Sequence, residues 1–285
     1  MNYFNKYKLK NYVTLVIISY RSFKTIKPVL KKYSNILKII VIENSQDKYF
    51  KNYVKKNFIN VDVHLQNNIG YGGAINYASK YVKTKYFFAI NPDLKFKLIT
   101  LGNLLKAAES LKGKFGCLNA VNKYQNSKNI KNEIEHVKSI NGSGMFFSKK
   151  NFIKIGGFDK NIWLFYEEND FCKRANKLNY NLYIINNAIT YHEGGKSMDS
   201  NSRKSNYNML LVKYWHGQWS KYYFYKKYFG TIKALTKTFP KFIKLNFQLI
   251  ITFFYNPKKS KQYLFQIYGL ICSIIGLKSF LRPKS

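Results

Sequence analysis

The sequence predicts an α/β fold built on a largely parallel sheet, followed by a helical, basic C-terminal region. Three short apolar runs recur in the first third of the chain, VTLVII (13–18), KIIVI (38–42) and KYFFAI (85–90). Each run ends in a polar, turn-like stretch, and segments of helical length such as TIKPVLKKYSNIL lie between them. Strands that alternate with helices in this way are typical of βαβ units and a parallel sheet.

The later elements follow in order along the chain. A short strand is expected at residues 61–65, and FGCLNAV (115–121) and GMFFSK (144–149) read as further strands. NFIKIGGFD is expected to form a short helix ending in a glycine turn, and FYEENDFCKR an acidic turn leading into a helix. NLYIINNAITYHEGG returns as strand and loop. Ligands of such sheets bind outside the carboxyl ends of the strands, so we expect the polar stretches after the strands to share one crevice.

The composition restricts the class of protein. With 285 residues the chain is long enough for one large domain, or for one domain plus a smaller appendage, and 18% aromatic residues predict a sizeable core. The formal net charge of +36 fits an anionic partner such as nucleic acid, anionic lipid or a phosphorylated ligand, but it also fits a general compositional bias. Three widely spaced cysteines argue against a zinc site or a disulfide scaffold. The N-terminal apolar run is too short for a typical signal peptide, so we expect a cytoplasmic location.

The last part of the chain differs in charge from the rest. We expect a catalytic domain over residues 1–200 and a helical region over 201–285. Residues 200–285 contain 14 Lys, 2 Arg and no acidic residue, and their two apolar stretches, 245–255 and 263–277, are shorter than the ~20 residues needed to span a bilayer. A basic, aromatic, amphipathic region of this kind is typical of a membrane-surface element. An ordinary helical subdomain packed on the core is the alternative.

Acidic residues are scarce, with 13 against 49 basic ones, so their positions are informative. Asp93 in AINPDLKF follows a buried strand, where a carboxylate could hold Mg²⁺ or Mn²⁺ or simply suit the turn after Pro92. Glu43 follows the second strand and could accept hydrogen bonds from a ribose or base, or be a solvated turn residue. Ser19 and Tyr20, at the end of the first strand, could contact a nucleobase.

Three further stretches carry candidate chemistry. The glycines of NNIGYGGAIN (67–76) allow a backbone to approach a ligand before a helix, although the spacing is neither a dinucleotide fingerprint nor a P-loop. FYEENDFCKR places three carboxylates within four residues, and one could serve as a general base. His192 lies in a loop that could bring it to the same cation as Asp93.

In their order along residues 13–200, these stretches resemble the bacterial family-2 glycosyltransferases of GT-A fold, closest to the rhamnosyltransferase-like branch. The ordered set is SYRS, VIENS, NNIGYGGAIN, INPD, GSGMFF, GGFD, FYEENDFCKR and YHEGGKS. The resemblance implies a nucleotide-diphospho-sugar transferase fold, Rossmann-like with a mixed sheet flanked by helices. It further implies inverting transfer of a sugar from a nucleotide-diphosphate donor, with a divalent cation as cofactor.

The resemblance also implies roles for particular residues. The donor-binding positions are Ser19, Tyr20, Glu43, Asn67, Gly70, Asn76 and Asn91. Asp93 is the implied metal ligand, with His192 as a second one, and Glu168 is the implied base, with Glu167 as the alternative. The acceptor-side positions are Gly144, Asp159 and Asp170. Two departures matter: Glu168 stands where Asp is commoner, and Asn91 replaces the first acid of the metal motif.

The expected enzyme uses dTDP-rhamnose or a UDP-sugar and a saccharide acceptor, lipid-linked, in surface polysaccharide synthesis. Its expected partners include an anionic membrane surface, on the cytosolic face of the inner membrane, and no nucleic acid. A nucleic-acid-binding basic protein is one alternative, but acids at strand ends would repel phosphates in the absence of a metal. An inactive GT-A scaffold is the other.

Overall fold

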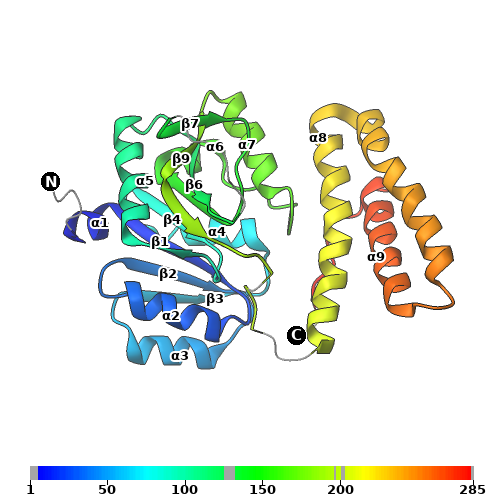
Figure 1. Ribbon diagram of the computed structural model, residues 1–285, viewed down its shortest axis with the longest axis horizontal. Helices are drawn as coiled ribbons and strands as arrows, with labels where there is room; N and C mark the ends of the chain where they lie inside the picture. The colour runs from blue at the N-terminus through cyan, green and yellow to red at the C-terminus, as the bar shows by residue number, and fades with distance from the viewer. Residues whose placement is uncertain (1–5, 125–131, 196, 200–202, 284–285) are drawn as a thin grey trace. The chain divides into compact units, whose positions relative to one another are not determined.

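The computed structural model describes residues 6–124, 132–195, 197–199 and 203–283. The chain forms two compact units, shown in Figure 1. The first, here called the α/β unit, comprises Met1–Phe158 and Glu168–Asp199. The second, the helical unit, comprises Asp159–Glu167 and Ser200–Ser285. Each unit is described by itself.

The α/β unit is built on a single mixed sheet. Its described strands are β1 (Val13–Ser19), β2 (Lys38–Glu43), β3 (Val61–Leu65), β4 (Tyr86–Ile90), β5 (Lys95–Phe96), β6 (Cys117–Asn122), β7 (Ile134–Val137), β8 (Gly144–Ser148) and β9 (Leu182–Tyr191). The order across the sheet is β3-β2-β1-β4-β8-β6-β9-β5, and β7 pairs with β9. The apolar runs of the first third therefore form neighbouring strands, as the alternation with helices predicts.

Strand directions place most strand ends at one edge of this sheet. β1, β2, β3 and β4 are mutually parallel, whereas β8 runs antiparallel to both β4 and β6. β6 therefore runs in the direction of β4, and β9 is parallel to β6. As a result, the carboxyl ends of β1, β2, β4, β6 and β9 share one edge with the amino end of β8, and we call this the carboxyl edge.

Helices cover both faces of the sheet. They are α1 (Lys6–Tyr12), α2 (Phe23–Tyr33), α3 (Lys48–Asn57), α4 (Tyr71–Ser79), α5 (Leu98–Ser110), α6 (Lys149–Ile155) and α7 (Glu167–Lys177). Successive side chains of a strand point to opposite faces. Leu15 and Ile17 pack in the cluster that includes α2, α3 and α5, while Val16 and Ile18 pack in the cluster that includes α4, α6 and α7.

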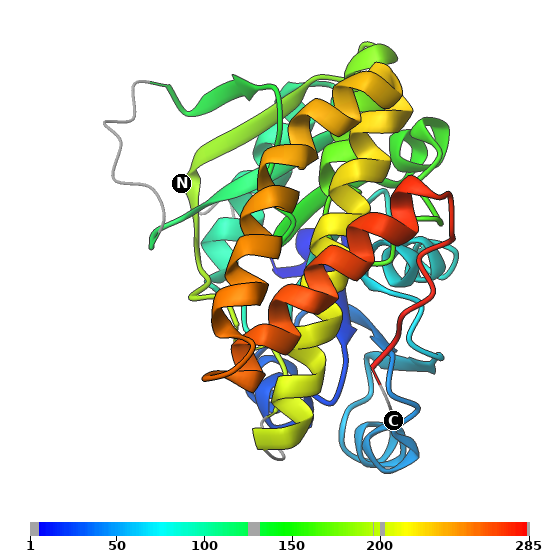
Figure 2. The same cartoon turned by 90° about the vertical axis from the view of Figure 1, so that its right-hand side faces the viewer.

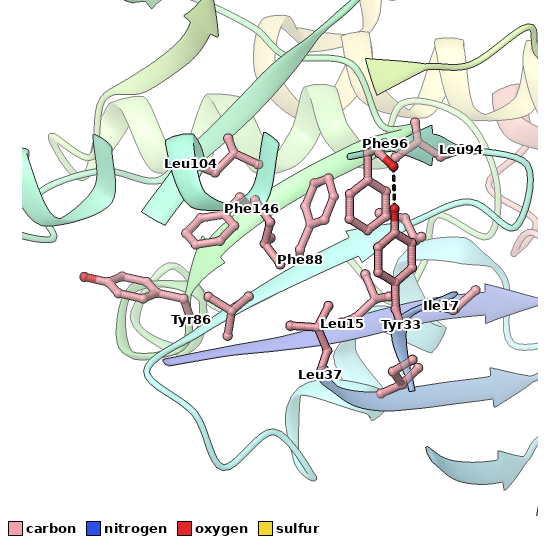
Figure 3. Close-up of a cluster of buried hydrophobic side chains, with 14 of the residues drawn as sticks. Leu15, Ile17, Tyr33, Leu37, Tyr86, Phe88, Leu94, Phe96, Leu104 and Phe146 are labelled. Carbon is pink, nitrogen blue, oxygen red and sulfur yellow. Dashed lines mark hydrogen bonds between the residues drawn. The ribbon is translucent and has the colours of Figure 1, made fainter. Parts of the chain in front are cut away.

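Aromatic side chains fill the first of these clusters. Figure 3 shows Phe96 beside Tyr33, with Phe88 and then Phe146 further along the cluster, and the Tyr33 hydroxyl donates a hydrogen bond to the Phe96 carbonyl. The Tyr33 and Phe96 rings stack with centroids 4.6 Å apart. Burial raises the pKa of Tyr33 to about 12. This contact attaches Phe96, three residues after Asp93, to α2. The turn that carries Asp93 is therefore held at its C-terminal end.

The helical unit consists of α8 (Arg203–Thr252) and α9 (Pro257–Ile274). Gly230 interrupts α8 with φ 80° and ψ 171°, a conformation that glycine adopts without steric cost. The chain reverses direction there (Figure 1), and Figure 2 shows the second half of α8 beside α9. Within the described residues, no helix is both long and apolar enough to cross a membrane.

Close packing joins the first half of α8 to α9. Trp215, Trp219 and Tyr223 follow one another at four-residue spacing and stack in a row. Trp219 Nε1 donates to the Leu277 carbonyl at 2.9 Å. A methyl group at Gly269 would lie 2.2 Å from the Trp215 carbonyl oxygen, so only glycine allows the two backbones to approach so closely.

We therefore expect Gly269→Ala to destabilise the helical unit by roughly 1–3 kcal/mol, because backbone must move to accept the methyl group. The matched control is Gly217→Ala in α8, where the nearest atom to the new methyl group lies 3.9 Å away. That change should be neutral or slightly stabilising, since alanine favours helix over glycine by up to about 1 kcal/mol. Thermal unfolding followed by circular dichroism compares the two, and equal stability of both variants would contradict the close approach.

Candidate active site

The ends of β1 and β2 are joined by a buried carboxylate. Ser19 and Glu43 are direct register partners in the parallel pair β1–β2. The Ser19 hydroxyl donates to one oxygen of Glu43, and the Ser45 amide donates to the other at 2.8 Å. The Ser45 hydroxyl donates to that second oxygen as well. Both Glu43 oxygens are thus engaged, which makes this carboxylate a fixed part of the carboxyl edge.

Tyr20 and the glycine loop lie next to this pair. Tyr20 is half-buried, and burial raises the pKa of its hydroxyl. Gly70 has φ 81°, directly before α4, and its carbonyl accepts from Asn44 Nδ2 at 3.3 Å. Asn67 is exposed and accepts from Gln46 Nε2 at 3.0 Å. The arrangement leaves an aromatic ring and the amino end of a helix at the same edge, which suits a nucleoside and an anionic group.

Asp93 meets His192 in space, 99 residues later in the chain. His192 Nε2 lies 3.3 Å from Asp93 Oδ1, and Ser197 Oγ donates to the same oxygen at 2.7 Å. The Asn91 side-chain amide lies 3.4 Å from His192 Nε2. Burial alone would raise the pKa of Asp93, but the hydrogen bonds from His192 and Ser197 lower it below its usual value. Asp93 is therefore held in its ionised form.

The pairing of β6 with β9 brings these residues together. Asn122 is the register partner of Thr190, and its side chain contacts the backbone of His192 on both sides: Nδ2 donates to the His192 carbonyl at 2.9 Å, and Oδ1 accepts from the His192 amide at 3.2 Å. β8 lies between β4 and β6 and runs antiparallel to both, and β9 is parallel to β6. The loop after β9 therefore emerges at the same edge as the turn after β4. The sheet thus fixes the Asp93–His192 contact.

Asp93 and His192 could supply two of the ligands that a divalent cation needs. Asp93 Oδ2 is buried and has no hydrogen-bond partner among the residues described. A carboxylate oxygen and an imidazole nitrogen are both ligands of divalent metals. Across the described part of the chain, however, no three His, Cys, Asp or Glu side chains come together as a metal site. A cation here would take its remaining ligands from a bound diphosphate and water, as Mg²⁺ commonly does.

Glu168, the predicted base, lies near the start of α7 beside the loop before β8. A methyl group at Gly142 would lie 3.9 Å from the Glu168 carboxyl carbon and 3.9 Å from the Tyr71 ring. The Tyr71 hydroxyl donates to the Gly142 carbonyl at 2.6 Å, so the Gly142 backbone is fixed beside Glu168. Burial raises the pKa of Glu168. A carboxyl group with a raised pKa is a better proton acceptor once ionised, as a general base requires.

The neighbouring acids have different surroundings. Glu167 is 5% exposed, compared with the partly exposed Glu168. Asp170 is fully buried and accepts from Arg174 Nε at 2.9 Å and Nη2 at 2.8 Å. Arg174 in turn donates to the carbonyls of Ile155 and Gly157, both at 2.6 Å. Asp170 therefore holds the glycine turn after α6 through Arg174.

Other predicted site residues also make structural contacts. Asn76 is bonded twice to the backbone of Phe158, donating to its carbonyl at 2.9 Å and accepting from its amide at 2.8 Å. Gly144 is buried in the sheet against Leu94 and Phe88. Asp159, in the helical unit, accepts from Lys227 at 2.6 Å and from Tyr223 at 3.0 Å. Burial would raise the pKa of Asp159, but Lys227 and its other donors lower it.

Residues 14–174 match the family described as Glycosyl transferase family 2. The chain belongs to glycosyl transferase family 2. This match covers more than half of the 285 residues and includes every predicted site residue except His192. The rhamnosyltransferase-like branch is a finer assignment that the family match leaves as a prediction.

One sequence relative and two solved structures resemble this family 2 protein at low sequence identity. A low-salt glycan biosynthesis hexosyltransferase, Agl10 of Haloferax volcanii, is 20% identical over 224 residues, covering 70% of this chain and 72% of its own. The crystal structure of GalNAc-T7 with UDP, GalNAc and Mn²⁺ has a TM-score of 0.53 at 13% identity. That match covers 76% of this chain but only half of the GalNAc-T7 chain. The S. aureus TarS 1–349 structure gives 0.50 at 14% identity, covering 92% and 81%. These likenesses confirm the GT-A fold.

The sequence did not predict the contacts that Ser197 and Asp199, after β9, make at the carboxyl edge of the α/β unit. Asp199 accepts from the amides of Lys24 and Thr25 at 2.6 and 3.1 Å, and so caps the start of α2. A carboxylate at a helix amino end is favourable. The Ser22 hydroxyl donates to the Ser197 carbonyl at 2.6 Å, which fixes the residue that contacts Asp93. The scarcity of acids was a signal for Asp199, the last one in the chain; nothing local pointed to Ser197.

The engagement of Glu43 yields a stability prediction. Glu43→Ala should lower the free energy of unfolding by about 1–3 kcal/mol, because it leaves the buried Ser19 hydroxyl and the Ser45 donors without acceptors. Glu43→Gln is the matched control: its amide can still accept from Ser45 and donate to Ser19, so we expect a smaller loss. Urea unfolding of both variants measures the difference. Full stability of the alanine variant would show that the carboxylate does not fix the strand ends.

Proposed function

We propose that this chain is an inverting glycosyltransferase that moves a sugar from a nucleotide-diphosphate donor to a saccharide acceptor. The observation that carries the proposal is the partly buried pair of Asp93 and His192 at the carboxyl edge, with Asp93 Oδ2 available for a ligand. Family membership supports the reaction class. The GalNAc-T7 structure with UDP, GalNAc and Mn²⁺ supports a nucleotide sugar and a divalent cation.

The donor lies, in this proposal, along the carboxyl edge. Tyr20 contributes its ring to the nucleobase, and Ser19 and Glu43 hold the strand ends that line the nucleoside. Asn67, Gly70 and the amino end of α4 line the donor, where backbone amides favour an anion. Asn91 contacts His192, a proposed cation ligand, and so lies beside the diphosphate in this proposal. Asn76 does not contact the donor in this proposal, because its side chain is hydrogen-bonded to the backbone of Phe158.

Asp93 and His192 are the proposed protein ligands of Mg²⁺ or Mn²⁺. When bound there, the cation supplies charge neutralisation for the leaving diphosphate. Ser197 holds Asp93 in orientation through its hydrogen bond to Oδ1, which leaves Oδ2 for the cation. Asn122 holds His192 through the His192 backbone.

Glu168 is the proposed base. It takes the proton from the acceptor hydroxyl as that oxygen forms its bond to the anomeric carbon, on the face opposite the breaking bond to the diphosphate. Configuration is therefore inverted. Gly144 and Asp170 belong to the acceptor side in this proposal, Asp170 by holding Arg174 and the turn after α6. Asp159 is proposed there too, although its carboxylate is engaged by Lys227 and Tyr223.

The finer assignments concern the substrates and the location of the enzyme. We propose dTDP-rhamnose or a UDP-sugar as donor, a lipid-linked acceptor, and a role in surface polysaccharide synthesis. The Agl10 hexosyltransferase, named for glycan biosynthesis, supports the last of these. The proposed location is peripheral, on the cytosolic face of an anionic inner membrane. Nucleic-acid binding is disfavoured because Glu43 and Asp93 lie at the edge where a phosphate backbone would be bound.

The cation proposal predicts a binding defect that needs no turnover. Adding Mn²⁺ with UDP should raise the melting temperature of the native chain, because a ligand that binds only the folded state stabilises it. Asp93→Asn should weaken Mn²⁺ affinity about a hundredfold or more, since changes even outside the ligand shell cost 10–100-fold. Asp62→Asn removes the same charge at an exposed position of β3 and is the control. Undiminished stabilisation of the Asp93 variant would refute its role as a ligand.

The base proposal predicts a loss of transfer with donor binding intact. Glu168→Gln should lower kcat by about 10²–10⁴-fold, the usual contribution of a general base. Glu167→Gln is the companion variant and should have a smaller effect; the opposite order would reassign the base to Glu167.

The pH dependence follows from the raised pKa of Glu168. A base acts in its ionised form, so transfer should decline as the pH falls through this pKa, and the decline should begin above the usual glutamate value of 4.5. The acid limb of kcat/KM against pH measures it. An acid limb at or below the usual value would be inconsistent with Glu168 as the base.

A further inference from the structure

The helical unit carries a row of exposed apolar side chains. We define the apolar stripe as Ile232, Phe239, Ile243, Phe247, Ile250 and Phe254, each between 55% and 89% exposed. The first five belong to the second half of α8, and Phe254 follows its end. Their spacings of 3, 4 or 7 residues place them on one face of a helix with 3.6 residues per turn. The stripe is about 30 Å long at 1.5 Å per residue.

The opposite face of the same segment is the one that packs. Ala234, Thr238, Leu245 and Thr252 are buried, at spacings of 4 and 7 residues. Ala234 packs with Tyr222 of the first half of α8 and Leu270 of α9. The internal packing of the helical unit therefore already uses one face of this segment, and the stripe is an additional apolar surface. Contiguous apolar surface of this extent marks an interaction site.

Charge identifies the kind of partner. Residues 200–285 contain 16 basic residues and no acidic one. Lys233, Lys237, Lys241 and Lys244 lie on the same segment as the stripe. Burial, followed by repulsion from Lys241 and Lys237, lowers the pKa of Lys221, which indicates that these cations crowd one another. An anionic partner relieves that repulsion.

A second copy of this chain does not fit the stripe. In a two-fold dimer the same patch of both subunits meets, so the two lysine-rich segments would be brought together. The segment has no carboxylate to pair with them. An anionic lipid surface instead accepts both features, since apolar side chains enter the acyl boundary while lysine stems extend toward the headgroups. Each lysine near such a surface contributes about 1 kcal/mol.

We propose that the apolar stripe is a membrane-docking face, which inserts into an anionic bilayer with the second half of α8 lying in the plane of the interface. This deepens the proposed peripheral location by assigning it to particular side chains. Binding to lipid does not depend on the proposed sugar transfer, because the stripe includes none of the proposed catalytic or donor residues.

The test is co-sedimentation of the full chain with vesicles of phosphatidylcholine, with and without phosphatidylglycerol, in the absence of any nucleotide sugar. The native chain should bind the anionic vesicles more tightly. Phe247→Glu/Ile250→Glu should weaken binding about a hundredfold, because two large side chains lose their apolar burial. The matched control is Ile59→Glu/Ile153→Glu, which changes two exposed isoleucines of the α/β unit and should bind like the native chain.

Three outcomes overturn the proposal. One is equal binding by the native chain and the Phe247/Ile250 variant, which would mean that lysines alone attract the vesicles. Another is equal loss of binding in both double variants, which would mean that the added negative charge, and not the lost apolar side chains, weakens binding. The third is a native dimer in sedimentation equilibrium that the Phe247/Ile250 variant abolishes, with no vesicle binding. Circular dichroism confirms that each variant is folded, and donor-induced thermal stabilisation tests the transferase proposal separately.

Discussion

The α/β unit depends on the pairing of antiparallel β8 between β4 and β6. This single reversal leaves β4, β6 and β9 running the same way, so the chain leaves β4 and β9 at the same edge of the sheet. Asp93 and His192 meet there, close to the ends of β1 and β2 where Ser19 and Glu43 are joined. Residues from four strand ends thus come together at one edge of the sheet without being close in sequence.

Four of the described carboxylates in this acid-poor chain have specific structural roles. Asp47 caps α3 and Asp199 caps α2, while Asp170 holds Arg174 against the turn after α6. Glu43 ties β1 to β2. Each compensates the cost of burying polar backbone or side-chain groups that would otherwise lack partners. Asp93 differs from these four because one of its buried oxygens keeps no partner among the described residues, and this is the physical reason for assigning it to a ligand.

Much of the fold followed from local patterns, whereas the contacts that finish the site did not. Apolar runs ending in polar turns predicted β1, β2 and β4, and their parallel order predicted the shared edge. The sequence predicted a contact of Asp93 with His192 only if their two loops meet. Periodicity does not reveal the strand order beyond β4, so it could not establish that they do. The bonds of Asn76 to Phe158 and of Ser197 to Asp93 join residues 82 and 104 positions apart, for which spacing carries no signal. The reversal at Gly230 was hidden for another reason: a lone glycine in an otherwise helical pattern is usually tolerated.

The central claim is that Asp93 and His192 hold a divalent cation against the diphosphate of the donor. Pulsed electron paramagnetic resonance of bound Mn²⁺ tests it most directly. With UDP present, the account predicts a ¹⁴N coupling from one imidazole together with ³¹P coupling from the diphosphate, and the ¹⁴N coupling should vanish in a folded His192→Ala variant. A Mn²⁺–UDP complex that binds the native chain without any imidazole coupling would contradict the account.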